Sequence, residues 1–154
     1  MGYFGEILVA RSVQPLAESS AIGGTAVLDE RELGSGWRLA QLDGGVPGAL
    51  AELTRLTGAP ALSVFVIDSD TALVEAVSPA GSGWMAHLHP EHAAELGAPE
   101  LELDTPEIVV RAVAWAAEAG LSVDAGAVEA ALSAKNVFVE ETFDELLAAL
   151  GIAA

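Results

Sequence analysis

Three histidines, His87, His89 and His92, stand within six positions of one another and are the only histidines of the chain. On a β-strand, side chains two residues apart point to the same face, so His87 and His89 would present two imidazoles side by side. Such a pair suits a divalent metal ion, with His92 or a carboxylate as the third ligand. The carboxylates that could complete the site are Asp68, Asp70 and Glu75. Imidazole together with carboxylate is typical of zinc or ferrous iron, so the pattern predicts a metal site of that kind.

Pro90 supports a second interpretation of the same histidines. A proline at the first helical position makes His89 the residue before the helix and takes it out of strand geometry. His92 then lies in the first turn, where free amide protons disfavour the imidazolium form. In this interpretation the three rings share no face and are simply solvated, and the sequence leaves both interpretations open.

Other carboxylates form short patterns without a visible partner. Asp68 and Asp70 flank Ser69 in a predicted turn, where such side chains accept hydrogen bonds from backbone amides. The segment 100–104, ELELD, places three carboxylates on one side of an extended chain. We interpret this segment as a solvated acidic edge, with contact to a cation or to a basic protein as the alternative.

No motif of a known catalytic centre is present. The chain lacks a glycine-lysine phosphate loop, a GxGxxG turn after a strand and a GxSxG nucleophile elbow. Cysteine is absent, which excludes disulfides, thiolate metal ligands and thiol nucleophiles. The catalytic residues are therefore unknown. The sequence favours a protein that is not an enzyme. We expect no cofactor, unless the histidines bind the zinc or iron ion considered above.

Negative charge is the strongest property of the whole chain. There are 23 acidic residues against six basic ones, and the formal net charge is −17. Such a surface repels phosphate backbones and anionic lipids, so we expect neither a nucleic-acid nor a membrane partner. It attracts a basic protein, although the acidic residues could equally serve only to keep an alanine-rich chain soluble. The absence of cysteine and of a signal-type apolar run favours the cytoplasm.

Hydrophobic periodicity predicts one α+β domain over 1–154, strand-rich over 1–97 and helical over 98–154. Strands are predicted over 3–13, 36–44, 61–67, 72–77 and 84–89, and 25–31 is either a short strand or a turn. Helices are predicted over 46–57, 90–96, 106–119, 124–132 and 139–150. We expect a mainly antiparallel sheet of about five strands, with the helix 46–57 and the C-terminal helices packed on it.

The aromatic residues divide into two groups. Trp37, Trp84 and Trp115 each lie on a predicted apolar face, and we expect two of the three to be buried. Tyr3 and Phe4 stand between glycines near the N-terminus. Exposed aromatic side chains at such a position can form a partner-binding site.

Three segments, MGYFGEILVAR (1–11), GWRLAQLDG (36–44) and VIDSDTALVEAVSPAGSGW (66–84), resemble small uncharacterised proteins of high-GC actinomycetes. That resemblance implies no activity. In size, acidity and α+β layout the chain is also loosely similar to the acidic immunity proteins that neutralise toxin enzymes. This second resemblance rests on no shared motif, so it assigns no functional residues.

Together these observations favour a non-enzymatic protein-binding module of immunity-like or regulatory type, with a basic protein as its partner. The alternative is a divalent-metal-binding protein or metal-dependent enzyme built on His87, His89 and His92. A small-ligand pocket between sheet and helices is a third candidate that the sequence does not address.

Overall fold

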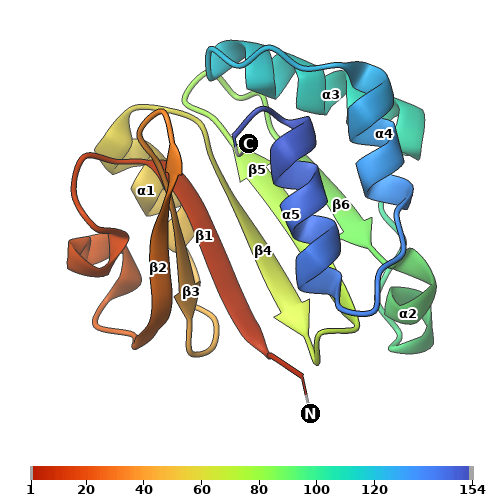
Figure 1. Cartoon of the computed structure of the whole chain (residues 1–154), viewed down its shortest axis with the longest axis horizontal. Helices are drawn as coiled ribbons and strands as arrows, with labels where there is room; N and C mark the ends of the chain where they lie inside the picture. Colours follow the sequence, from red (N-terminus) through yellow and green to blue (C-terminus); the bar gives the residue numbers. More distant parts are fainter. Residues whose placement is uncertain (1, 153–154) are drawn as a thin grey trace.

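In the computed structural model, which describes residues 2–152, six strands form one sheet in the order β2-β3-β1-β4-β5-β6 (Figure 1). The strands are β1 (Gly5–Arg11), β2 (Val27–Gly34), β3 (Trp37–Leu42), β4 (Ala61–Ile67), β5 (Thr71–Val77) and β6 (Trp84–Leu88). All neighbouring pairs are antiparallel. The predicted α+β class with a mainly antiparallel sheet is confirmed, and β4, β5 and β6 form the expected meander.

The additional strand is β2, which the sequence left open between strand and turn. As the edge strand it pairs only with β3, and most of its side chains are exposed. Its register shifts twice, between Val27 and Asp29 and between Glu32 and Gly34. Irregular pairing and charged side chains are common ways to stop an edge strand from pairing with another chain.

The helices follow the predicted segments closely. They are α1 (Ala49–Thr57), α2 (Pro90–Glu95), α3 (Thr105–Glu118), α4 (Ala125–Ser133) and α5 (Val139–Ala149), with short 3-10 turns η1 (Leu16–Glu18) and η2 (Ser20–Ile22). The helix predicted over 46–57 begins three residues later, because Gly48 adopts a left-handed φ of 81°. Asp104 caps α3 by accepting a hydrogen bond from the Glu107 amide at 3.1 Å. No helix within residues 2–152 has the length and apolar character that a bilayer crossing requires.

The three C-terminal helices cover one face of the sheet, and Figure 1 shows α5 crossing in front of the strands, with α4 beside it and α3 across the top. Alternate residues of the strands meet these helices in the larger core. All three tryptophans are buried there, one more than expected, with Trp115 of α3 contacting both Trp37 and Trp84 at ring-centroid distances of 6.3 Å. The Trp115 indole N–H donates to the Val77 carbonyl at 2.9 Å.

A smaller core lies on the opposite face, under α1, η1 and η2. Leu50 and Leu53 of α1 pack there with Leu8 of β1 and Leu42 of β3. The buried strand residues of this core come from β1, β3 and the first residue of β4, Ala61. On this face, therefore, the helical cover is confined to one half of the sheet.

Glu30 ties the loop before β2 to the sheet. Its carboxylate accepts hydrogen bonds from the amides of Leu16 and Ala17, at 2.6 and 2.9 Å, and from Arg38 Nε at 2.9 Å. Burial alone raises the pKa of Glu30, but the Arg38 guanidinium and the two amides outweigh it and bring the pKa below its ordinary value. The side chains of Glu30 and Arg38 are only 11% and 15% exposed.

We predict that Glu30→Ala destabilises the fold by about 2–4 kcal/mol, because it leaves two amides and a nearly buried guanidinium short of an acceptor. Glu32→Ala is the matched control, since Glu32 also pairs with Arg38 but is 78% exposed; its cost should stay below about 1 kcal/mol. Chemical denaturation measures both. The extra stability from Glu30 should fade as pH falls through its lowered pKa. Equal losses in the two variants would contradict this role.

Candidate functional site

The two histidines of the predicted His-x-His pair do not share a face. His87 lies within β6, where it pairs with Leu73 of β5. β6 ends at Leu88, and His89 adopts a left-handed φ of 53° immediately before α2. The second interpretation of Pro90 therefore describes the local backbone: the residue before the helix leaves strand geometry.

Both ring nitrogens of His89 are engaged inside the protein. Nδ1 donates to the Asp70 carbonyl oxygen at 2.8 Å, because a carbonyl can only accept. Nε2 lies 2.7 Å from Thr142 Oγ1, and Thr142 Oγ1 accepts a hydrogen bond from Asn136 Nδ2 at 2.9 Å. Since Thr142 is fully buried and His89 is 6% exposed, this chain of hydrogen bonds joins the β4–β5 turn to α5.

The remaining predicted ligands are dispersed. His92 Nδ1 lies 3.2 Å from the Asp70 carbonyl oxygen, and its ring centroid is 6.0 Å from that of His89. His87 Nε2 donates to the Pro99 carbonyl at 3.2 Å. Asp68 accepts from the Gly2 amide, which lies 66 residues away and outside the predicted turn, and Glu75 lies in the middle of β5.

Within residues 2–152 no three histidine, aspartate or glutamate side chains come together in an arrangement that could hold a metal ion. The structure brings His89 close to His92 and leaves His87 apart. The zinc or iron site stays a prediction, without a converging ligand set in the described range.

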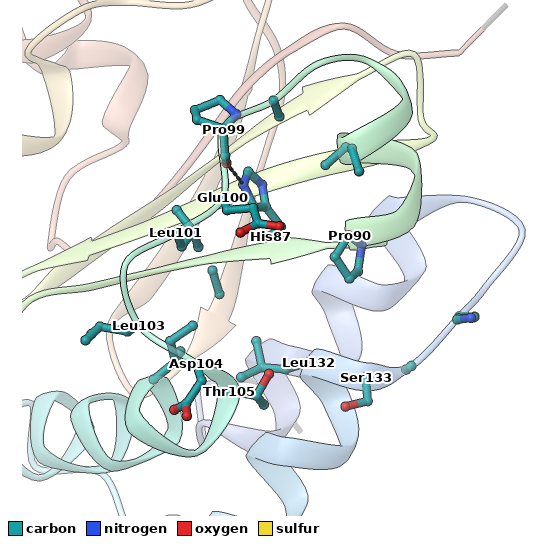
Figure 2. A pocket seen from close by; sticks show the side chains of 17 residues that line it. His87, Pro90, Pro99, Glu100, Leu101, Leu103, Asp104, Thr105, Leu132 and Ser133 are labelled. Carbon is teal, nitrogen blue, oxygen red and sulfur yellow. Dashed lines mark hydrogen bonds between the residues drawn. The ribbon is translucent and has the colours of Figure 1, made fainter.

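A cavity of about 550 Å³ opens at the β6 edge, between β6, α2 and the helices α3 and α4 (Figure 2). His87 stands on its wall, and Figure 2 shows its ring directed to Pro99, with Thr105, Leu132 and Ser133 on the opposite side. A second cavity of about 440 Å³ lies beside it, and the two share Glu100, Leu101 and Leu103. Leu101 and Leu103 pack against the larger core. The acidic segment thus lies along the β6 edge with space on both sides.

The least expected feature is the sheet face opposite α3 to α5. Along β5, Ala72, Val74 and Ala76 are buried towards those helices, whereas Leu73 and Glu75 alternate with them and point to the other face. We call the uncovered part of that face the open sheet face. It consists of Phe4, Glu6, Phe65, Leu73, Glu75, Met85 and, at the β6 edge, His87, which pairs with Leu73.

Large apolar side chains are exposed on the open sheet face. Phe4 is 57% and Met85 38% exposed, and the Phe4 ring contacts Phe65 edge-on at a centroid distance of 5.2 Å. Tyr3 behaves differently from its neighbour: its hydroxyl donates to the Leu42 carbonyl at 2.6 Å, and burial raises its pKa. Of the two N-terminal aromatics, therefore, Phe4 is the exposed one.

Two carboxylates flank these apolar side chains. Glu6 of β1 accepts a hydrogen bond from the Val46 amide at 3.1 Å. Burial raises the pKa of Glu6, the Val46 amide lowers it, and the nearby charge of Glu75 raises it further, with a net upward shift.

Neither Glu6 nor Glu75 has an ion-pair partner among residues 2–152. They belong to a large excess: five of the 23 acidic side chains take part in ion pairs, which leaves 18 without a basic partner in the described range.

The open sheet face is hard to recognise in the sequence of 61–67, because this strand is apolar on both of its faces. In the structure Phe65 and Ile67 are only partly buried. The signal that could have found the face is Glu75: a carboxylate within β5 marks the outward side of that strand, and Leu73 shares that side.

Comparison of the chain with protein-family models, with curated proteins and with solved structures finds no match. The site must therefore be interpreted from its own geometry.

We predict that His89→Ala destabilises the protein by about 2–4 kcal/mol, because it removes two buried hydrogen bonds and opens a cavity against α5. His87→Ala removes one hydrogen bond from a partly exposed ring, so its cost should be below about 1 kcal/mol. Thermal or chemical denaturation distinguishes them. Near-stoichiometric zinc or iron in the purified protein, lost in either variant, would instead support the metal site.

We also predict that Glu6→Gln becomes more stabilising, relative to the natural chain, as pH rises from 4 to 7. The pKa of the Glu6 carboxyl is raised on folding, so its ionisation begins to oppose folding once pH rises above the ordinary value of 4.5. This loss of stability is complete when pH exceeds the folded-state pKa. Glutamine keeps an acceptor for the Val46 amide without the charge facing Glu75. Denaturation at several pH values measures the difference, and a difference that does not change with pH would contradict it.

Proposed function

We propose that this protein binds a basic partner protein through the open sheet face, as an immunity-like or regulatory module. One observation carries the proposal: helices cover one face of the sheet, but on the other face they leave much of β5 and β6 and the Phe65 end of β4 uncovered. That region presents exposed apolar side chains next to carboxylates without cations. Contiguous exposed apolar surface with a polar rim is typical of protein-binding sites.

The charge of the face decides which partner fits. Glu6 and Glu75 lie within the open sheet face, and Glu100 and Glu102 line the neighbouring cavity at the β6 edge. Arg111 is the single basic residue of that cavity. A partner with arginine or lysine between apolar residues would pair these carboxylates and bury the aromatic rings. A net charge of −17 would also attract such a partner over a distance and speed association.

A second copy of the same chain is a poorer occupant. In a twofold dimer through this face, Glu6 and Glu75 of one copy would meet the same acidic patch of the other. Each copy also carries a formal charge of −17. Like charges brought together in this way oppose association.

We further propose that the interaction takes place in the cytoplasm. The chain has no cysteine, and proteins of reducing compartments depend on neither disulfides nor exposed thiols for stability.

The proposal is tested by placing a photo-crosslinking amino acid at position 65 or, as a control, at position 110 of α3. Val110 is a 70% exposed apolar residue outside the open sheet face. In lysate of the native host we expect position 65, and not position 110, to capture one predominant protein with a positive net charge. Its purified form should associate at least about tenfold faster at low than at high salt.

The matched variants are Leu73→Lys and Val110→Lys, which introduce the same positive charge into the open sheet face and on α3. We expect Leu73→Lys to weaken the captured complex at least about 30-fold, because it places a cation against a basic partner at a central interface position, and Val110→Lys to leave it unchanged. Capture of an acidic protein, salt-independent association, a stable homodimer through this face, or equal effects of the two variants would each overturn the proposal.

A further inference from the structure

A small cavity lies at one end of the open sheet face, where the chain enters α1. Its volume is about 300 Å³, and we call it the carboxylate cavity; its principal lining residues are Glu6, Val46, Leu50, Ser63, Phe65 and Glu75. Pockets for drug-sized ligands run from about 300 to 1,000 Å³. The carboxylate cavity is at the lower limit, a size suited to one long side chain rather than to a larger ligand.

Two acidic side chains reach this cavity from opposite sides of β4. Glu6 pairs with Phe65 across β1 and β4, and Glu75 pairs with Ser63 across β4 and β5. Both side chains line the cavity, and the charge of Glu75 contributes to the raised pKa of Glu6. The formal charge of this pair is not matched by any ion pair within residues 2–152.

The walls of the cavity are held in place before anything binds. The Val46 amide fixes one oxygen of Glu6, Oε2, and leaves the other for a further donor. The Phe65 ring packs so closely on the loop before α1 that a Cβ on Gly45 would lie 2.9 Å from it. On its other side Phe65 contacts Phe4. Preorganised acceptors and a fixed aromatic wall reduce the cost of ordering on binding.

From this geometry we propose that the carboxylate cavity binds the guanidinium group of an arginine side chain presented by the basic partner. The proposal rests on the proposed function and names the anchor of that interaction. A planar guanidinium has five donors, enough to bond Glu6 and Glu75 together, and it packs favourably on an aromatic wall such as Phe65. The three methylene groups of arginine fit the apolar part of the cavity, beside Leu73 and Val77. An ammonium group has a more compact charge and cannot bridge the two carboxylates in the same way.

The test uses N-acetyl-arginine amide as the probe, with the lysine and norleucine analogues beside it. Titration into the isotopically labelled protein at pH 7 and low salt is followed by NMR. We expect the arginine probe to shift the signals of Phe65, Ser63 and the Glu6 and Glu75 side chains, and to bind at least about tenfold more tightly than either analogue.

Three charge-removing variants complete the test. Glu6→Gln and Glu75→Gln should each weaken binding of the arginine probe by about tenfold or more, because each removes a charge-assisted contact. Glu129→Gln removes the same charge from an exposed position on α4 and should change nothing. Glu75 is exposed, so its variant tests the cavity without risk to folding. Equal binding of the lysine probe, or unchanged binding in both cavity variants, would overturn the proposal.

Failure of this inference and failure of the proposed function give different results. If the captured partner binds Glu6→Gln and Glu75→Gln as tightly as the natural chain but is lost with Leu73→Lys, the arginine anchor is wrong and binding through the open sheet face stands. If Leu73→Lys binds normally, binding through the open sheet face is itself wrong, whatever the arginine probe does.

Discussion

A β-sheet has two faces, and this chain has enough helix to cover one of them completely and the other in part. The central strands β1 and β4 bury side chains on both sides, so they need cover above and below. The helices α3 to α5 supply it on one side for the larger core. On the other side the short α1 with η1 and η2 covers β1 and β3. The uncovered region over β5, β6 and the Phe65 end of β4 follows from this unequal supply of helix.

Hydrophobic patterns in the sequence were sufficient to predict most elements. The helices predicted over 106–119 and 139–150 match α3 and α5 to within one residue at each end, because each has a long apolar stripe and α3 also has an N-terminal cap, Asp104. β2 was harder, since an edge strand with most side chains in solvent has no apolar alternation to reveal it. Helix α1 begins later than predicted because Gly48 has a left-handed backbone conformation. Composition alone does not specify that conformation.

The candidate site was less predictable than the fold. His87 and His89 form a common pattern only if the strand continues through both, and the backbone at His89 turns into a left-handed conformation. The partners of its ring, Asp70 and Thr142, are 19 and 53 residues away in sequence, and no local pattern indicates such contacts. The open sheet face depends in the same way on strand order, because Glu6 and Glu75 line one cavity only when β1 and β5 lie on either side of β4.

The cluster of Trp37, Trp84 and Trp115 has a practical consequence for spectroscopy. Every tryptophan of the chain lies on the helix-covered side of the sheet, at most 3% exposed. Trp37 and Trp84 also have indole N–H groups that are buried without an acceptor in the described range. Intrinsic fluorescence should therefore report the packing of α3 against the strands. Contacts made on the reverse side would leave its emission nearly untouched, so a dye or isotope label there would be needed to observe them.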